Sequence, residues 1–390
     1  MAETFMTPSD TPSKSAASFS ISSSVLYKQL AALSGVIVNN PVVPILENFL
    51  FEIAVGKLKV TASDLQTSII TELVIEAQEE VKIAIPARIL LDTLRNLPDQ
   101  PITFAIDEHA YGIEIHAANG QYSLAGENAA DFPQVVTVAG RVTVSMPAQV
   151  LKKAIQQTII ATSHDELRPA MNGVYMSFSE TSAAFVATDG HRLVRYTRTD
   201  ISVAAQESFI IPRKTLMLLT GLLSSDQAAV SITFGESSVH FQLSGTSMVA
   251  RLIDERYPDY ENVIPHNNPN QLAVNRASLL SSLKRTAVYA NRTTHQIRLA
   301  LGENTLQLLA EDLDFSNKAH EKLACDYTGQ GLTIGFNAKL LMELLNSLDT
   351  KEVIMQLSEP SRAALILPQE QAAQEDILLL IMPVLLTPGA

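Results

Sequence analysis

A short amphipathic helical segment recurs six times along the chain, and this repeat limits the fold more than any other feature of the sequence. The segments share an apolar pattern and an opening Ser, Pro or Asn, residues that suit the start of a helix. They begin at Ser22, Pro86, Pro147, Pro212, Asn275 and Asn337. Their aligned leucines, 64, 61, 65, 63 and 62 residues apart, are Leu26, Leu90, Leu151, Leu216, Leu279 and Leu341. This regularity predicts six structural units of similar size.

A second, longer period groups the six units in pairs. Three aspartates that follow strand-like runs, 125 and 123 residues apart, are Asp64, Asp189 and Asp312. Three dipeptides ending in proline, 125 and 125 residues apart, are Phe132-Pro133, Tyr257-Pro258 and Met382-Pro383. We therefore predict three domains of two half-repeats each, at residues 18–138, 139–265 and 266–390. The Ser-, Thr- and Pro-rich residues 1–17 are predicted to be a disordered tail.

Alternating apolar and polar residues lie between the predicted helices. Two clear examples are Lys57 to Thr61 and Val239 to Leu243. A period of two residues is typical of half-buried antiparallel strands. The predicted class is therefore α+β, with one helix and several antiparallel strands in each half-repeat and the helices on one face of the sheets. A solenoid is the alternative, although its repeats usually run about 20–50 residues.

The charge balance restricts how the chain could meet nucleic acid. Lys plus Arg is 28 and Asp plus Glu is 41, which gives a net charge of −13. Because DNA phosphates repel an acidic surface, any DNA contact must come from a local basic patch or be topological. The single cysteine, Cys325, excludes an intramolecular disulfide framework. The longest apolar run, near residues 377–386, is shorter than the roughly 20 residues of a membrane span, so we expect a soluble, cytoplasmic protein with no membrane partner.

Basic residues gather on the outward faces of several predicted helices. In the helix after Pro147, the face opposite the apolar residues carries Lys152, Lys153, Gln156 and Gln157. The helix after Asn275 presents Arg276, Lys284 and Arg285, and Arg213 and Lys214 open another. The alternative is that these are ordinary solvated helix faces. In an acidic chain, however, they predict one cationic surface for weak, sequence-independent and salt-sensitive contact with duplex DNA.

The segment from Ala187 to Leu193 invites a catalytic interpretation, because Asp189 and His191 lie two residues apart beside Arg192. The repeat argues against it, since Asp64 and Asp312 occupy the equivalent place in the other domains. Asp189 is therefore interpreted as a turn residue that bonds its own backbone. The segment offers too few ligands for a metal site, and no Gly-rich phosphate loop is present, so no cofactor and no catalytic residue are predicted.

Several motifs resemble those of the bacterial DNA polymerase III beta subunit family, the beta sliding clamps. They are ATDGHRL from Ala187, RPAMNGV from Arg168, IIPRK from Ile210, YPDYENVIP from Tyr257, GFNAK from Gly335 and MPVLL from Met382. The resemblance runs from about Ser18 to Leu386 with the motifs in the family's order. It implies a DNA-clamp fold and a non-catalytic processivity factor that forms a head-to-tail homodimer, a six-domain ring around double-stranded DNA.

The resemblance also implies the partners and the residues that meet them. The replicative polymerase subunit, the clamp loader and repair proteins would dock short peptides with Gln and Leu/Phe anchors between domains two and three. The implied peptide-binding residues are Arg168, Met171, Thr188, Gly190, His191, Arg192, Leu193, Pro258, Val263, Asn337, Met382, Pro383 and Leu386. The implied dimer interface holds Tyr122, Val288 and Tyr289. The DNA-binding residues, from the resemblance and the helix faces together, are Arg88, Lys152, Lys153, His164, Arg213, Lys214, Lys284 and Arg285.

The sequence departs from the family pattern on both predicted surfaces. Asn262 and Leu340 replace an Arg and a Tyr near the peptide site, and Thr387 to Ala390 extend past the usual end toward it. On the DNA side Asn40 replaces an Arg, and Pro169 and Ala170 replace a Tyr pair. Two other functions stay open: an enzyme that uses Asp189 and His191, and a monomeric scaffold with no role on DNA.

Overall fold

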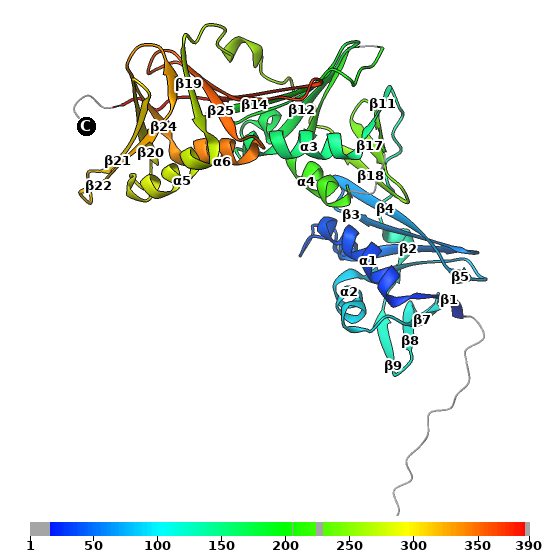
Figure 1. The fold of residues 1–390 in the computed structure, drawn as a ribbon. Coiled ribbons are helices and arrows are strands. Elements are labelled where there is room, and N and C mark those ends of the chain that lie inside the picture. Colours follow the sequence, from blue (N-terminus) through cyan, green and yellow to red (C-terminus); the bar gives the residue numbers. More distant parts are fainter. Residues whose placement is uncertain (1–15, 205, 224–228, 387–390) are drawn as a thin grey trace, which may run out of the picture. The chain divides into compact units, whose positions relative to one another are not determined.

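The computed structural model describes residues 16–204, 206–223 and 229–386 (Figure 1). The predicted tail, apart from its last two residues, and the extension Thr387–Ala390 lie outside these residues. Ala16 and Ala17, which were assigned to the tail, belong instead to the first strand, β1 (Ala16–Ser22). Ala17 pairs with Ile106 and is buried. Ala16 and Ala17 were therefore wrongly assigned to the tail.

All six predicted helices are present in the described residues, and each begins one residue after its predicted start. They are α1 (Ser23–Leu33), α2 (Ala87–Asn96), α3 (Ala148–Thr158), α4 (Arg213–Leu222), α5 (Arg276–Thr286) and α6 (Ala338–Ser347). Ser22, Asn275 and Asn337 cap their helices by accepting backbone N–H hydrogen bonds. Pro86 and Pro147 occupy the N-cap position without a side-chain bond. The repeat in the sequence is thus a repeat of helix starts.

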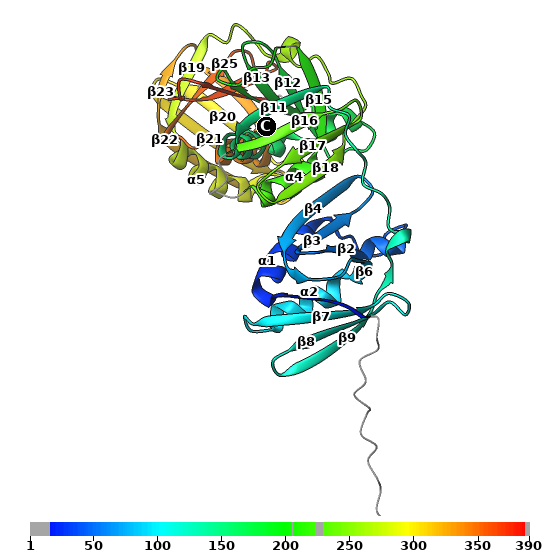
Figure 2. The same ribbon diagram turned by 90° about the vertical axis from the view of Figure 1, so that its right-hand side faces the viewer.

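The chain forms two compact units, and the first comprises residues 1–145 and 221–251. Its smaller sheet has the order β5 (Glu76–Ala77), β1, β7 (Pro101–Asp107), β8 (Gly112–Ala117) and β9 (Gly120–Ala125). The larger sheet has the order β10 (Glu127–Asn128), β6 (Val81–Pro86), β2 (Asn48–Ala54), β3 (Lys57–Ser63), β4 (Thr67–Val74), β18 (Thr246–Arg251), β17 (Ser238–Gln242), β16 (Ala229–Phe234) and β11 (Val142–Pro147). In Figure 2, β4 lies above helix α2, and β8 and β9 lie below it.

The second unit comprises residues 146–220 and 252–390. Its larger sheet has the order β15 (Glu207–Pro212), β12 (Gly173–Phe178), β13 (Ala183–Thr188), β14 (Arg192–Arg198), β27 (Glu375–Ile381), β26 (Ala364–Pro368), β25 (Glu352–Leu357), β19 (Asn270–Asn275) and β23 (Asp326–Thr328). Its smaller sheet has the order β22 (Asn317–Ala324), β21 (Thr305–Asp312), β20 (Gln296–Gly302) and β24 (Leu332–Asn337). Helices α3, α5 and α6 lie on one side of the larger sheet (Figure 1).

The two larger sheets run across the predicted domain boundaries. β4 pairs with β18, and β14 pairs with β27, so strands from neighbouring predicted domains share one backbone ladder. Neighbouring predicted domains are therefore joined by continuous hydrogen-bonded sheets, and the packing does not mark where one domain ends. The boundaries near residues 138 and 265 therefore stay predictions, whereas the antiparallel α+β architecture is confirmed.

Apolar side chains of the alternating strands form the cores. In the first unit Phe19 stacks on Phe104, with ring centroids 4.6 Å apart, and both rings contact Phe51. Each such fully buried side chain contributes about 1.5–3 kcal/mol relative to an exposed one. The predicted strands at 57–61 and 239–243 correspond to β3 and β17 and bury every second residue at their starts or centres. Period-two alternation thus located these strands correctly.

Candidate functional site

The loop between β13 and β14 is built around a turn that Asp189 closes. Its Oδ1 accepts hydrogen bonds from the backbone N–H groups of His191 and Arg192, at 2.9 and 3.0 Å. Asp64 accepts in the same way from Gln66 and Thr67. Asp312 accepts from the N–H of Asp314. The interpretation of Asp189 as a turn residue is confirmed; Asp64 closes the same kind of turn, and Asp312 opens a longer one.

The middle copy of this turn carries additional contacts. Thr188 Oγ1 donates to the carbonyl of Arg192 at 2.7 Å and accepts from the N–H of Gly190. Gly190 has a φ of +88°, a conformation that a side chain would strain. A Cβ at Gly190 would also lie 3.1 Å from Arg168 Nη1, which donates to the carbonyl of Asp189. Arg168 therefore lies directly against the loop.

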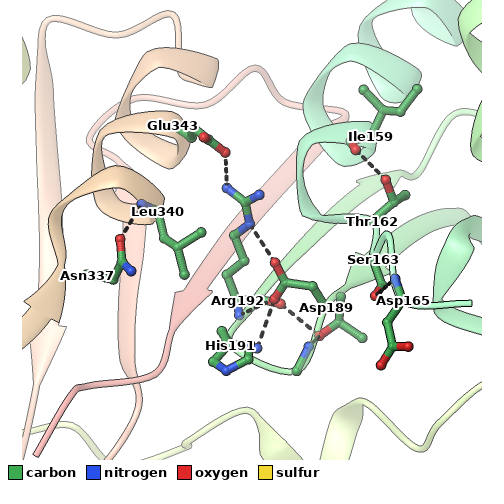
Figure 3. A network of polar contacts seen from close by, with 12 residues as sticks. Ile159, Thr162, Ser163, Asp165, Asp189, His191, Arg192, Asn337, Leu340 and Glu343 are labelled. Atoms are coloured by element: carbon green, nitrogen blue, oxygen red, sulfur yellow. Dashed lines mark hydrogen bonds and ion pairs between the residues drawn. The ribbon is translucent and has the colours of Figure 1, made fainter. Parts of the chain in front are cut away.

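Arg192 connects this loop to helix α6. Its Nε donates to Asp189 Oδ2 at 3.1 Å, and its Nη1 donates to Glu343 Oε2 at 2.6 Å. Figure 3 shows the guanidinium group between these two carboxylates. The Arg192 side chain is 8% exposed and the Glu343 side chain 49%. An ion pair of one buried and one half-exposed group thus joins two elements that are 151 residues apart.

The C-terminal segment runs from this loop to strand β24. The N–H of Met382 donates to the carbonyl of His191, and the N–H of Val384 donates to the carbonyl of Gly335, both at 2.8 Å. A Cβ on Gly335 would lie 2.7 Å from the Val384 carbonyl oxygen and from Leu386 Cδ2. Residue 335 therefore has to be glycine for the segment to dock this closely.

An apolar cluster lies beneath the loop and the C-terminal segment. It includes Leu193, Tyr257, Ile264 and Leu380, with Tyr260 packed against it. Burial, with a smaller contribution from Glu261, raises the pKa of Tyr260 to about 12, so the phenol is neutral at physiological pH. Beside these buried residues the side chains of Val263 and Met382 are 54% and 40% exposed. Exposed apolar side chains that rest on a well-packed apolar cluster can bind an apolar side chain of a partner protein.

The structure places the thirteen predicted peptide-binding residues in the second unit. The loop 188–193, Arg168 and the segment 382–386 are joined by the contacts above. Pro258 and Val263 adjoin Tyr257 and Ile264 of the apolar cluster, and Met171 lies on the turn that follows Arg168. Asn337 is the N-cap of α6: its Oδ1 accepts from Lys339 and Leu340. We call the loop, the segment and the exposed side chains of Val263 and Met382 the peptide surface.

Several predicted DNA-binding side chains have protein partners. Lys153 Nζ donates to Glu375 at 2.6 Å, and Arg285 makes two bonds to Glu321 at 2.7 and 2.6 Å. Arg213 donates to the Ile159 carbonyl and to Thr162, and Arg88 donates to Asn39. The exposed residues of this set are Arg88, His164, Lys214, Lys284 and Arg285, whereas Lys152, Lys153 and Arg213 are partly buried. Contact with DNA at Lys153, Arg213, Arg285 and Arg88 would therefore compete with these internal bonds.

One assignment on this surface was wrong. Gln157 was placed on the solvated face of helix α3, but it is 7% exposed and donates from Nε2 to the carbonyl of Ser347 at 2.6 Å. The cause is the end of α6, which packs over this part of α3 and needs a donor for its carbonyl group. A helical wheel drawn for α3 alone cannot include this neighbour.

The predicted interface residues are exposed at the margins of two sheets. Tyr122 belongs to β9, the edge strand of the smaller sheet in the first unit. Val288 and Tyr289 lie in a short 3-10 turn, Ala287–Tyr289, that follows α5 in the second unit and contacts the edge strand β22. Their side chains are 38%, 77% and 45% exposed. Exposed apolar groups next to unpaired strand edges are typical of protein interfaces.

Neither a metal site nor a membrane span is present among the residues that the structure describes. No group of three or more His, Cys, Asp or Glu residues in this part of the chain could hold a metal ion. No helix within the described ranges is long and apolar enough to cross a bilayer.

Comparison with known structures places this architecture in the class of DNA sliding clamps. The crystal structure of a sliding clamp from Pseudomonas aeruginosa bound to griselimycin matches with a TM-score of 0.91 at 28% identity, covering 95% of this chain and 100% of that one. The clamp of Bacillus subtilis matches at 22% identity with a TM-score of 0.90, covering 96% of this chain and 100% of its own, which shows the fold alone.

Sequence comparison identifies the family. Profiles of the DNA polymerase III beta subunit match residues 17–136 (N-terminal domain), 145–259 (central domain) and 261–384 (C-terminal domain). The beta sliding clamps of Pseudomonas putida and Escherichia coli are 29% and 27% identical, each covering 94% of this chain and 99% of the relative. The chain belongs to the DNA polymerase III beta subunit family. It is a sliding clamp for DNA replication and a non-catalytic subunit.

Two residues of this site had no assigned role in the sequence analysis. Gly335 was quoted as part of a motif, but its close approach to Val384 and Leu386 becomes visible only when the C-terminal segment is in place. Glu343 is an acidic residue on a helix, a common occurrence that carries no signal by itself. Its partner Arg192 is far away in the sequence, so spacing could not have connected the two.

Proposed function

We propose that two copies of this chain close head to tail into a ring around duplex DNA in the cytoplasm. The exposed residues Tyr122, Val288 and Tyr289 support this proposal, since they lie at or against edge strands of different sheets. Such a contact joins two different surfaces, and it closes with two copies only if each chain contributes half of the ring. Within the ring we assign domains to residues 18–138, 139–265 and 266–390.

The oligomeric state tests this part directly. Light scattering after size exclusion should give about twice the chain mass of 42.4 kDa. Replacing Tyr122 by Asp should shift the protein to single chains, because a buried unpaired carboxylate opposes association. Val136→Asp, at another exposed apolar residue of the first unit, is the control and should leave the mass unchanged. A wild-type protein that stays at 42.4 kDa at micromolar concentration would refute the ring.

The contact with DNA is proposed to be weak and independent of sequence. Its candidates with exposed side chains are Arg88, His164, Lys214, Lys284 and Arg285. Lys153, Arg213 and Arg285 contribute charge from positions that internal contacts hold in place. Lys284→Ala should weaken binding to any duplex equally and lower the slope of log affinity against log salt by about one.

The peptide surface is proposed to bind short segments of the polymerase, the clamp loader and repair proteins. The observation that carries this proposal is the docked C-terminal segment, which places exposed Met382 beside the loop 188–193 over an apolar cluster. A short synthetic peptide with Gln and Leu-Phe anchors should bind with a Kd on the order of micromolar. Met382→Glu should abolish this binding without changing the mass of the dimer. If the wild-type protein binds no such peptide at millimolar concentration, the assignment of this surface is wrong.

A further inference from the structure

Arg192 and Leu193 are neighbours in β14, but their side chains lie on opposite faces of the sheet. Successive side chains of a strand point to opposite faces of the sheet. Leu193 packs into the apolar cluster that underlies the peptide surface. Arg192 therefore points to the opposite face, where it borders a pocket together with His164, Arg213 and Glu343. The Arg192 guanidinium group thus lies away from the apolar cluster that Leu193 joins.

We propose that Glu343 is a positioning residue for partner binding: it acts through Arg192 to hold the loop 188–193 against helix α6. This inference rests on the proposed peptide surface and adds a residue to it. Arg192 is then a link between elements and not a peptide contact, which separates it from its neighbours His191 and Leu193.

The other side-chain bonds of the loop do not reach α6. The bonds that Asp189 Oδ1 accepts from His191 and Arg192, and the bonds of Thr188, are internal and fix only the shape of the loop. The 2.6 Å contact between Arg192 and Glu343 connects that shape to α6. Because the His191 carbonyl also accepts from Met382, a shift of the loop would move the C-terminal half of the peptide surface as well.

Arg192 is buried and Glu343 is half exposed, so the strength of their ion pair should depend on the salt concentration. Arg192 is nearly buried and keeps its bond to Asp189 when Glu343 is removed, so the loop keeps its internal shape but loses its direct link to α6. Glu343 is half exposed, so dissolved ions screen its attraction to Arg192. The contribution of Glu343 to peptide affinity should therefore be moderate and should decrease with salt.

Fluorescence anisotropy of the labelled Gln/Leu-Phe peptide, titrated with the full-length protein, tests the proposal. Glu343→Gln should weaken binding about fivefold, the equivalent of an ion pair of about 1 kcal/mol. Glu343→Asp should recover part of this loss. Glu311→Gln, which removes the same charge from an ion pair with Lys318 in the same unit, is the matched control and should bind like the wild type. The ratio of wild-type to Glu343→Gln affinity should approach one near 1 M salt.

Amide hydrogen exchange separates positioning from general stability. In Glu343→Gln the N–H groups of Arg192 and Met382 should exchange faster, while the melting temperature changes no more than in Glu311→Gln.

If wild type and Glu343→Gln bind the peptide equally at low salt, the proposal is wrong and the peptide surface stands. If both fail to bind, the peptide surface itself is wrong. If Glu343→Gln binds weakly only because it unfolds, Glu343→Asp must show the affinity loss in a folded protein or the proposal fails.

Discussion

The ladder between β14 and β27 is held by charged groups at both ends, and the two ends differ in how they are built. At one end Glu375 accepts hydrogen bonds from Lys153, Tyr196 and Arg198, and the side chains of Glu375 and Arg198 are 10% exposed. At the other end Arg192 meets the half-exposed Glu343. A buried cluster with many partners resists change, whereas a half-solvated pair is easily screened. We call the end at Glu375 the fixed end, because its charges are buried. We call the end at Arg192, beside the peptide surface, the adjustable end, because solvent can weaken its ion pair.

Removal of the carboxylate at the fixed end should produce the largest effect. Glu375→Gln leaves Lys153 and Arg198 without their shared partner, although Arg198 keeps Asp200 at 2.6 and 2.8 Å. We expect a loss of about 3 kcal/mol in the unfolding free energy of the second unit, because one partner of a buried ion pair is removed. Urea unfolding followed by circular dichroism measures this loss. Glu311→Gln, the surface control, should cost less than about 1 kcal/mol, and equal losses would remove the distinction between the ends.

The same difference should depend on pH. Burial alone would raise the pKa of Glu375, but hydrogen bonds from Lys153 and Tyr196 and the charge of Arg198 bring it below its ordinary value of 4.5. A carboxyl with a lowered pKa stabilises the fold above its unfolded pKa, and that stability is lost as pH falls through the folded value. The stability gap between wild type and Glu375→Gln should thus be complete above about pH 5 and should shrink below 4.5. A gap that grows on acidification would contradict this.

The docking of the C-terminal segment should have the next largest effect. Gly335→Ala places a Cβ about 2.7 Å from the Val384 carbonyl and from Leu386, so the segment must move away from β24. We expect peptide affinity to fall about tenfold, since overpacking costs about 1–3 kcal/mol. Gly331→Ala is the control, because a Cβ there meets only the Leu301 carbonyl at 3.8 Å. Equal affinities of both variants would show that the segment does not shape the surface.

The smallest effect is expected at the exposed side chain of His191. The loop uses the backbone N–H and carbonyl of this residue, so His191→Ala should keep the fold of the loop. Peptide affinity should fall less than about threefold, as for one peripheral contact. The same variant tests the enzyme alternative, because an enzyme dependent on His191 would lose turnover on its substrate while keeping its affinity for the peptide.

Much of the fold was predictable because it depends on local patterns. The helix starts follow from Ser22, Asn275 and Asn337, which cap the backbone within three residues of themselves. The turn at Asp189 also needs only its next three residues. The recurrence of an aspartate at the equivalent place in all three repeats, Asp64, Asp189 and Asp312, then favoured a structural over a catalytic role.

The details of the site were less predictable because they depend on contacts distant in sequence. Lys153 was expected to point a free charge at DNA, but Glu375, 222 residues away, holds it. Arg192 was grouped with the peptide contacts, whereas its partner Glu343 lies on α6, 151 residues on. The strands β4 and β18 share a ladder that crosses a predicted domain boundary. The repeat of the sequence could not predict these pairings, because they form only when distant segments pack together in the folded chain.

The retention of the protein on DNA circles tests the proposed ring most directly. The dimer is loaded with an ATP-driven clamp loader onto a nicked circular duplex, separated from free protein by gel filtration, and the circle is then cut once. We predict that the protein stays with the intact circle in moderate salt and is lost within minutes of the cut, because a ring slides off an end without any change in its contacts. Equal retention on the circular and cut forms, or equal loss from both, would contradict encirclement.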